Sequence, residues 1–179
     1  MNIIGYIKTF GHLSFLDKPF NNVDALILTT LSYLNFELLT SDDKEKSLFI
    51  RDIPDDMIVK LCDGEFITKP NEKMIRLLKN TKRYQNIEIK YIYKVHDKLN
   101  TIQFFAMTLI VPNYHPFICF RGTDLTLLGW KEDLLLAVKN VVPSQIEALN
   151  YTNYVSKKVG GSFSIGGHSK GGNLAIFAS

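Results

Sequence analysis

The chain is poor in cysteine and has little excess charge, and each scarcity argues against a class of protein. Among its 179 residues are two cysteines, Cys62 and Cys119, and neither has a second Cys or His at ligand spacing. We therefore expect no metal site, and two lone thiols suggest a reducing compartment. Lys and Arg total 21 against 18 Asp and Glu, and no dense basic block stands out. This balance argues against nucleic-acid binding.

Long apolar runs are also lacking. No stretch reaches the roughly 18 consecutive apolar residues of a transmembrane helix. The first residues, MNIIGYIKTFGHLSF, lack the basic segment and apolar run of a signal peptide. We therefore expect a cytoplasmic protein without a transmembrane segment. What is present is a globular composition, 46% hydrophobic and 22% charged, at a length that suits one domain.

The hydrophobic pattern changes near residue 87. Before that point apolar residues recur at helical spacing. Helices are expected over 23–34, with Asn22 as the N-terminal cap, and over 53–61 and 71–84. After it, strands are expected over 87–95, 101–111 and 116–120, separated by turns at 96–100 and 112–115. In the first strand the alternating residues should share one face; they are Ile87, Ile89, Tyr91 and Tyr93.

Helix and strand signals alternate in the last part of the chain. Ser144 and Glu147 form a capping box that starts a helix, and Gly160 suits its C-terminal cap. A short strand over 162–166 and a final helix follow. The strands over 101–111 and 116–120 are apolar on both faces, which is typical of a sheet covered by helices on each side. The sequence therefore predicts an α/β fold with a mostly parallel sheet.

A glycine-rich junction follows the last predicted strand. Residues Gly167 to Gly171 read G-H-S-K-G, the spacing of a nucleophile elbow. In such a turn Gly167 and Gly171 avoid clashes, Ser169 projects its hydroxyl, and the Lys170 N–H faces a developing oxyanion. The simpler alternative is a glycine-rich turn that leads into a helix. A phosphate-binding loop is excluded, because its lysine precedes the Ser or Thr.

A second candidate motif is CFRGTD, Cys119 to Asp124, after the strand over 116–120. A hydrolase of this type needs another oxyanion donor from a loop after an earlier strand. The N–H and hydroxyl of Thr123 suit that role. The alternative is a polar turn in which Thr123 caps the next helix. The co-occurrence of this loop with the elbow favours the oxyanion role.

Together the two motifs carry a resemblance. FRGTD followed by Trp130 and Asp133-Leu134, together with GHSKGGNLA, resembles the corresponding segments of class 3 lipases. The opening 36 residues resemble a bacterial family of uncharacterised lipase-like α/β-hydrolases. The resemblance implies Ser169 as nucleophile and Thr123 and Lys170 as oxyanion-hole residues. It also implies structural roles for other residues: an ion pair of Arg121 with Asp133, and packing for Trp130. The segment 125–130, LTLLGW, either lines an acyl site or lid or belongs to the core.

Hydrolases of this fold carry the triad acid and base after the serine. The ten residues after Ser169 contain neither an acid nor a His. We therefore expect the N-terminal portion of an α/β-hydrolase fold, a single incomplete domain over 1–179 that lacks the C-terminal strands. Residues 1–86 are mainly helical in this interpretation, and 87–179 hold the sheet, oxyanion loop and elbow. An apolar sheet edge would then be exposed and favour a homo-oligomer.

No histidine of the chain is expected to be the base. His168 adjoins Ser169 but points elsewhere as a packing residue, and His12, His96 and His115 fall in predicted loops or turns. The resulting hypothesis is a serine esterase or lipase of the EC 3.1.1 type, nearly inactive as this chain alone. It would act on small-molecule or lipid esters through an acyl-enzyme on Ser169, without metal or cofactor. The alternative is a non-catalytic binding or assembly module that keeps the hydrolase scaffold.

Overall fold

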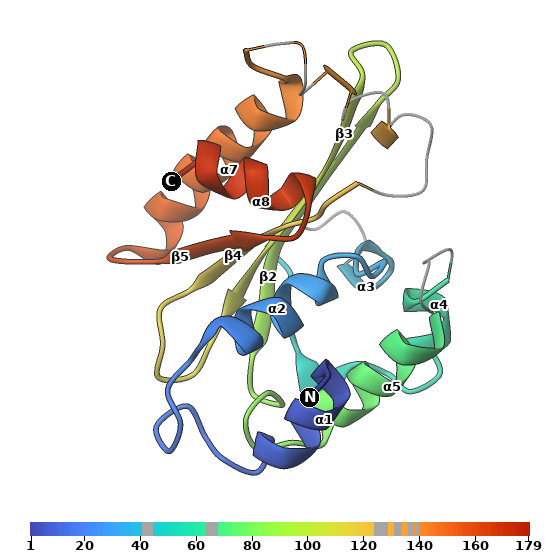
Figure 1. The fold of residues 1–179 in the computed structure, drawn as a ribbon, viewed down its shortest axis with the longest axis vertical. Helices are drawn as coiled ribbons and strands as arrows, with labels where there is room; N and C mark the ends of the chain where they lie inside the picture. Colours follow the sequence, from blue (N-terminus) through green and yellow to red (C-terminus); the bar gives the residue numbers. More distant parts are fainter. Residues whose placement is uncertain (41–44, 64–67, 124–128, 131–133, 136–137, 139) are drawn as a thin grey trace.

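A mixed sheet runs through the centre of the molecule and has helices on both faces (Figure 1). The structure is a computed structural model, and it describes residues 1–40, 45–63, 68–123, 129–130, 134–135, 138 and 140–179. The described helices are α1 (Ile3–Phe10), α2 (Asn22–Leu31), α3 (Glu37–Thr40), α4 (Ile58–Leu61), α5 (Thr68–Lys79), α7 (Pro143–Val159) and α8 (Lys170–Phe177), with a 3₁₀ turn at Ile50–Asp52. The strands are β1 (Leu48–Phe49), β2 (Glu88–Asp97), β3 (Ile102–Ile110), β4 (Phe117–Phe120) and β5 (Ser164–Gly167). The α/β class expected from the sequence is confirmed.

The described strands follow one another across the sheet in chain order, β1-β2-β3-β4-β5. The pairs β1–β2, β2–β3 and β3–β4 are antiparallel, and only β4–β5 is parallel. The prediction of a mostly parallel, hydrolase-like sheet is therefore wrong. The physical reason lies in the short turns at 98–101 and 111–116, because strands joined by a tight turn can only pair antiparallel.

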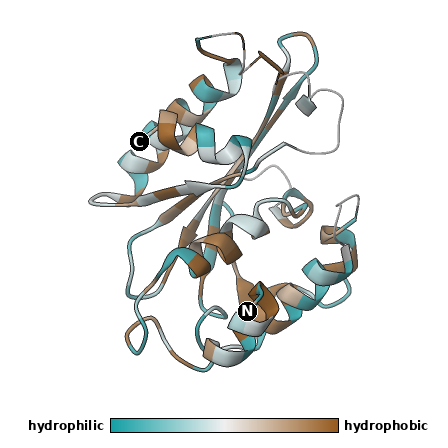
Figure 2. Ribbon diagram, in the orientation of Figure 1, coloured by the Kyte–Doolittle hydropathy of each residue, from teal (hydrophilic) through white to brown (hydrophobic). Residues whose placement is uncertain are grey.

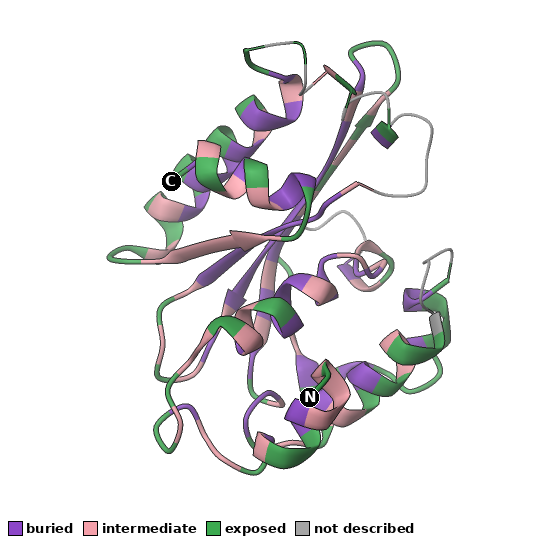
Figure 3. Cartoon of the chain, viewed as in Figure 1, coloured by how far each residue is buried: buried purple, intermediate pink, exposed green. Residues whose placement is uncertain are grey.

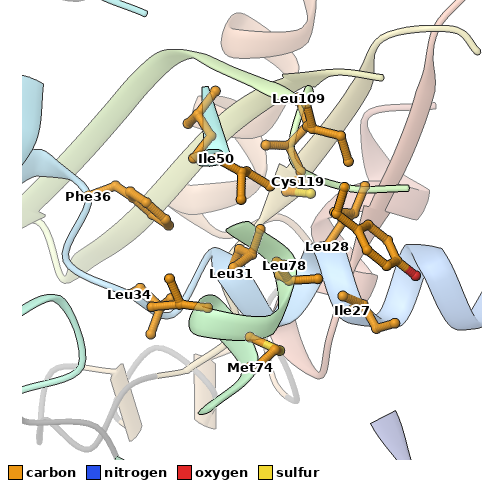
Figure 4. Close-up of a cluster of buried hydrophobic side chains, with 14 of the residues drawn as sticks. Ile27, Leu28, Leu31, Leu34, Phe36, Ile50, Met74, Leu78, Leu109 and Cys119 are labelled. Atoms are coloured by element: carbon orange, nitrogen blue, oxygen red, sulfur yellow. The ribbon is translucent and has the colours of Figure 1, made fainter. Parts of the chain in front are cut away.

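One layer of apolar side chains covers each face of the sheet. Along β3, Phe105 and Met107 pack with the helices α1, α2, α4 and α5, while Phe104 and Ala106 pack with α7 and α8. The strands are accordingly hydrophobic and buried at the centre of the molecule (Figures 2 and 3). Figure 4 shows the first layer, in which side chains from α2 and α5 meet Leu109 and Cys119 of the sheet.

Strand β2 departs from simple alternation. Its pairing with β3 shifts register between Lys90 and Tyr93, and Tyr91 has a φ of +52°. This bulge places Ile89 in the layer beside α2 and α5, and Tyr91 in the layer beside α7. The prediction that Ile87, Ile89, Tyr91 and Tyr93 share one face is therefore wrong, because an extra residue in the bulge reverses the side-chain order.

The helices predicted over 23–34 and 71–84 form as α2 and α5 with shifted ends. The prediction over 53–61 is wrong for its first half, because Pro54 is followed by a turn and only α4, Ile58–Leu61, is helical there. Helix α2 is capped by Asn21, not Asn22, and Asp24 closes a capping box with it. In α7 the N–H of Val142 donates to the Gln145 side chain, so the box predicted for Ser144 and Glu147 is displaced. The reason is Pro143, which occupies the first helical position and moves the start of the helix back by two residues. Gly160 does end α7, with a φ of +63°.

A buried ion pair fastens α2 to the segment between α5 and β2. Arg83 and Asp24 lie 2.6 Å apart, and both side chains are fully buried. The Tyr84 hydroxyl donates to the same carboxylate at 2.6 Å, and Arg83 also donates to the Lys18 carbonyl at 2.8 Å. Because every charged group of this cluster has several partners, the cluster fixes how the N-terminal helices lie on the sheet.

Candidate functional site

The candidate site lies at the sharp turn between β5 and α8. Only His168 and Ser169 separate the end of the strand at Gly167 from the start of the helix at Lys170. Ser169 has φ +56° and ψ −126°, a conformation that residues with a side chain rarely adopt. Such backbone strain costs on the order of 1–3 kcal/mol and is concentrated at functional sites. The serine is exposed, so its hydroxyl is accessible to a ligand.

Close backbone packing explains the two glycines of the turn. A Cβ on Gly167 would overlap the backbone of Gly171, and a Cβ on Gly171 would overlap the carbonyl of Phe120 at the end of β4. Any side chain at either position would push α8 away from the strands. The structure thus gives Gly167 and Gly171 the steric role that the sequence predicted for them.

The loop after β4 touches the turn after β5. A Cβ on Gly122 would lie 3.3 Å from Ser169 Cβ and 2.5 Å from the His168 carbonyl oxygen. The register explains this contact, because Phe120 is paired with Gly167 and the parallel strands end at the same edge. Thr123, the predicted second oxyanion residue, is half-buried and directly follows Gly122. The structure therefore brings the two predicted motifs together.

The backbone and the side chain of Lys170 have separate roles. Its amide belongs to the first turn of α8, where N–H groups point out beyond the helix. Its side chain is 4% exposed, and Nζ donates to the carbonyl and side-chain oxygens of Gln103 at 2.7 and 2.8 Å. The sequence predicted the amide's place but not this tie to β3, which holds the start of α8 against the sheet.

His168 is not placed to activate the serine. Its Nδ1 lies 3.0 Å from the hydroxyl of Tyr33, a residue just beyond α2. The predicted packing role is corrected, since His168 is exposed and hydrogen-bonded. Tyr33 was missed in the sequence, because nothing in its local pattern distinguishes it from a core aromatic. The other histidines, His12, His96 and His115, are exposed. Among the described side chains, none forms a hydrogen bond with the Ser169 hydroxyl.

Arg121 ties the loop after β4 to the segment that follows α2. Its side chain donates to the carbonyls of Ser32 and Leu34, the latter at 2.8 Å, and its guanidinium lies 3.9 Å from the Phe105 ring. This confirms a structural role, although its predicted partner Asp133 lies outside the described residues, as does Asp124. Trp130 is 61% exposed, so its predicted packing role is wrong.

Within the described ranges, no group of three or more His, Cys, Asp or Glu side chains is placed to hold a metal ion. The helices that the structure describes are too short or too polar to cross a membrane.

The fold and site define an α/β protein with a mixed sheet and an exposed serine in a strained strand-to-helix turn. The chain belongs to the Mbeg1-like family, whose model matches residues 78–179. This match overturns the assignment to class 3 lipases and to the lipase-like α/β-hydrolase family. It spans β2 to α8 and so includes both motifs. Neither the curated proteins nor the solved structures gave a match to the chain.

Proposed function

We propose that this protein is a serine hydrolase that acts on carboxylic esters through an acyl-enzyme on Ser169. The observation that carries the proposal is the backbone of Ser169, whose φ of +56° lies in an otherwise regular strand–turn–helix. A glycine would adopt this conformation without strain, so the serine at this position points to a use for its hydroxyl.

In the proposed reaction the Ser169 oxygen attacks the ester carbonyl carbon, and a general base takes the hydroxyl proton. The tetrahedral oxyanion accepts hydrogen bonds from the amides of Lys170 and Thr123, aided by the N-terminal end of α8. The bond to the leaving alcohol breaks as that proton is returned to it. Water then hydrolyses the acyl-enzyme and releases the acid. The proposal does not assign the base to His168, whose Nδ1 is bonded to Tyr33.

Lipid-like esters are the substrate class we favour. The segment that follows Thr123 exposes three apolar side chains at a spacing of four residues: Trp130, Leu134 and Val138, which are 61%, 71% and 79% exposed. Each of these three residues has helical backbone conformation. An acyl chain would find apolar surface there, close in sequence to the oxyanion loop.

Two further parts of the proposal concern the surroundings of the protein. A cytoplasmic location is supported by the scarcity of cysteine, since the chain has two, Cys62 and Cys119, and both are buried. Self-association through β5 is supported by its position at the edge of the described sheet. Because Gly166 and Gly167 make up half of β5, this edge is less apolar than the sequence pattern suggested. Light scattering over a range of concentrations would test the association.

The proposal is tested by intact-mass analysis after treatment with a fluorophosphonate. Because no described side chain bonds the Ser169 hydroxyl, we expect a single adduct that forms slowly on the chain. It should be lost in Ser169→Ala and retained in Ser162→Ala, a control at an exposed serine before β5. Circular dichroism would verify that each variant is folded. A folded chain without an adduct, or an adduct that persists in Ser169→Ala, would overturn the proposal. The first outcome would favour a non-catalytic module that keeps this scaffold.

A further inference from the structure

A cavity of about 360 Å³ lies between β2 and α7, on the face of the sheet that carries α7 and α8. Four tyrosines, one carboxylate and one amide line it: Tyr91, Tyr93, Tyr151, Tyr154, Glu147 and Asn150. Its volume falls in the range of small-molecule sites. Its lining includes no residue of the Ser169 turn or of the Gly122 loop.

The aromatic rings form walls in two orientations. The rings of Tyr93 and Tyr151 are nearly parallel, 14° apart, with centroids separated by 6.3 Å. Those of Tyr91 and Tyr154 are perpendicular, with centroids 5.9 Å apart. Several aromatic rings in different orientations around one space define what we call an aromatic cage, and the face of such a ring attracts a cation within about 6 Å of its centroid.

Three of the four tyrosine hydroxyl groups of the cage are hydrogen-bonded within the protein. Tyr93 donates to Glu147 at 3.1 Å, Tyr151 donates to the Tyr91 carbonyl at 2.8 Å, and Tyr154 donates to Glu45 at 2.8 Å. These bonds hold the rings in place, so binding would cost little reorganisation. The hydroxyls are therefore fixed parts of the frame, and the ring faces are what the cage offers to a ligand.

Glu147 gives the cavity a negative charge that no described side chain balances. In the part of the chain that the structure describes, Glu147 has no ion pair, and its one hydrogen bond is from Tyr93. The nearby Glu45 and Glu88, by contrast, pair with Lys158 at 2.9 Å and with Lys90 at 3.5 Å. Burial, and then the charge of Glu147, raise the pKa of Tyr93, in agreement with the hydrogen bond between the two side chains.

The rings of this cavity already attract ammonium groups. Lys158 Nζ lies 5.6 Å from the centroid of Tyr154, and Lys90 Nζ lies 5.9 Å from that of Tyr91. Neither lysine lines the cavity. The bulge in β2 brings Tyr91 to the cage at a strained φ of +52°. Strain of this kind is retained where the position of a side chain has a use.

We propose that this cavity binds a small organic cation, a quaternary or substituted ammonium group held by the tyrosine faces and balanced by Glu147. The inference goes beyond the proposed hydrolysis and does not depend on it. A neutral sugar is the competing ligand, since rings beside a carboxylate and an amide also suit it. The unbalanced charge of Glu147 favours the cation.

The test uses isothermal titration calorimetry with choline and with 3,3-dimethyl-1-butanol, its uncharged analogue of the same shape. We expect choline to bind at least about tenfold more tightly than the neutral analogue. Glu147→Gln and Tyr154→Leu should each weaken choline binding by about five- to tenfold. Tyr154→Phe keeps the ring and should bind within about twofold of the parent chain.

Glu72→Gln, on α5 at the other face of the sheet, is the matched charge control and should leave binding unchanged. Tyr154 is 38% exposed, so its replacement by Leu should leave the fold intact, which circular dichroism would verify. Equal affinity for the neutral analogue, absence of choline binding to the folded chain, or tighter binding of methyl glucoside would each overturn the proposal.

Discussion

Gly122 and Ser169 meet where β4 and β5 end, so close that a methyl group on the glycine would lie 3.3 Å from the Cβ of the serine. The same methyl group would lie 2.5 Å from the His168 carbonyl oxygen and would overlap the Tyr33 hydroxyl. The contact makes the two loops a single unit, in which neither can move without the other.

Replacement of Gly122 by Ala should therefore destabilise the protein by about 1–3 kcal/mol, because the His168 backbone and the Tyr33 side chain would both have to move. Urea denaturation would measure the loss. Gly5→Ala is the control, because its new methyl group would meet the flexible Met1 side chain at 3.0 Å and Asn2 Oδ1 at an ordinary 3.4 Å. That change in α1 should stabilise by about 0.5–1 kcal/mol. A Gly122→Ala variant as stable as the parent chain would contradict the contact.

Two substitutions at Ser169 should separate its strain from its chemistry. Ser169→Gly relieves a positive φ that Ser169→Ala retains, so the glycine variant should be more stable by about 1 kcal/mol. Both variants should lose the fluorophosphonate adduct. Paired urea denaturation curves would measure the difference. If the alanine variant were the more stable one, Ser169 would not be strained.

Substitutions at the neighbouring Lys82 and Arg83 should differ sharply in their effect on the stability of the folded protein. Arg83→Met leaves the fully buried Asp24 carboxylate without its cation and should cost about 3–5 kcal/mol. Lys82→Met removes an exposed pair with Asp17 at 3.1 Å and should leave the denaturation midpoint nearly unchanged. Similar midpoints for the two variants would contradict the buried ion pair.

Asp17 should show a pH dependence of its own. Hydrogen bonds from the Ser14 amide, then from its hydroxyl and from Lys82, lower the pKa of Asp17 from 3.8 to about 2. Because the folded pKa is the lower one, the stabilisation is present above about pH 4 and is lost as the pH falls from 3.8 toward 2.

Carbon-detected NMR titration of the Asp17 carboxyl would measure this pKa. In Lys82→Met the midpoint should stay below 3.8, because the largest contribution comes from the Ser14 amide. A midpoint at 3.8 in the parent chain would show that these hydrogen bonds do not form in solution.

The positions of the strands could be predicted from the sequence, but their pairing in the sheet was predicted wrongly. Polar turns and apolar runs located β2, β3 and β4, because strand ends depend on nearby residues. The same short turns indicate hairpins, and hairpins predict the antiparallel pairing of β2, β3 and β4. The mostly parallel sheet was predicted from strands that are apolar on both faces, a pattern that an antiparallel sheet covered by helices on both sides produces as well. The bulge at Tyr91 has no such local signal, since it depends on how β2 fits against β3.

The candidate site was predictable where it depends on backbone, and not where it depends on distant side chains. The glycines and Ser169 follow from the geometry of a tight strand-to-helix turn, which short sequence spacing encodes. The bonds from Tyr33 to His168 and from Lys170 to Gln103 join residues far apart in the chain. Their partners are set by the fold as a whole, which no local pattern can specify.

The parallel pairing of β4 with β5 also bears on how the protein folds. The hairpins from β2 to β4 join neighbours in the chain, whereas β5 reaches β4 only after a crossover from Arg121 to Phe163. Closing so long a loop loses more chain entropy than forming a hairpin, and such contacts form slowly. The hairpins can therefore condense first, and the meeting of Gly122 with Ser169 becomes a late event in folding. Any reactivity of that serine would report that the last strand has docked.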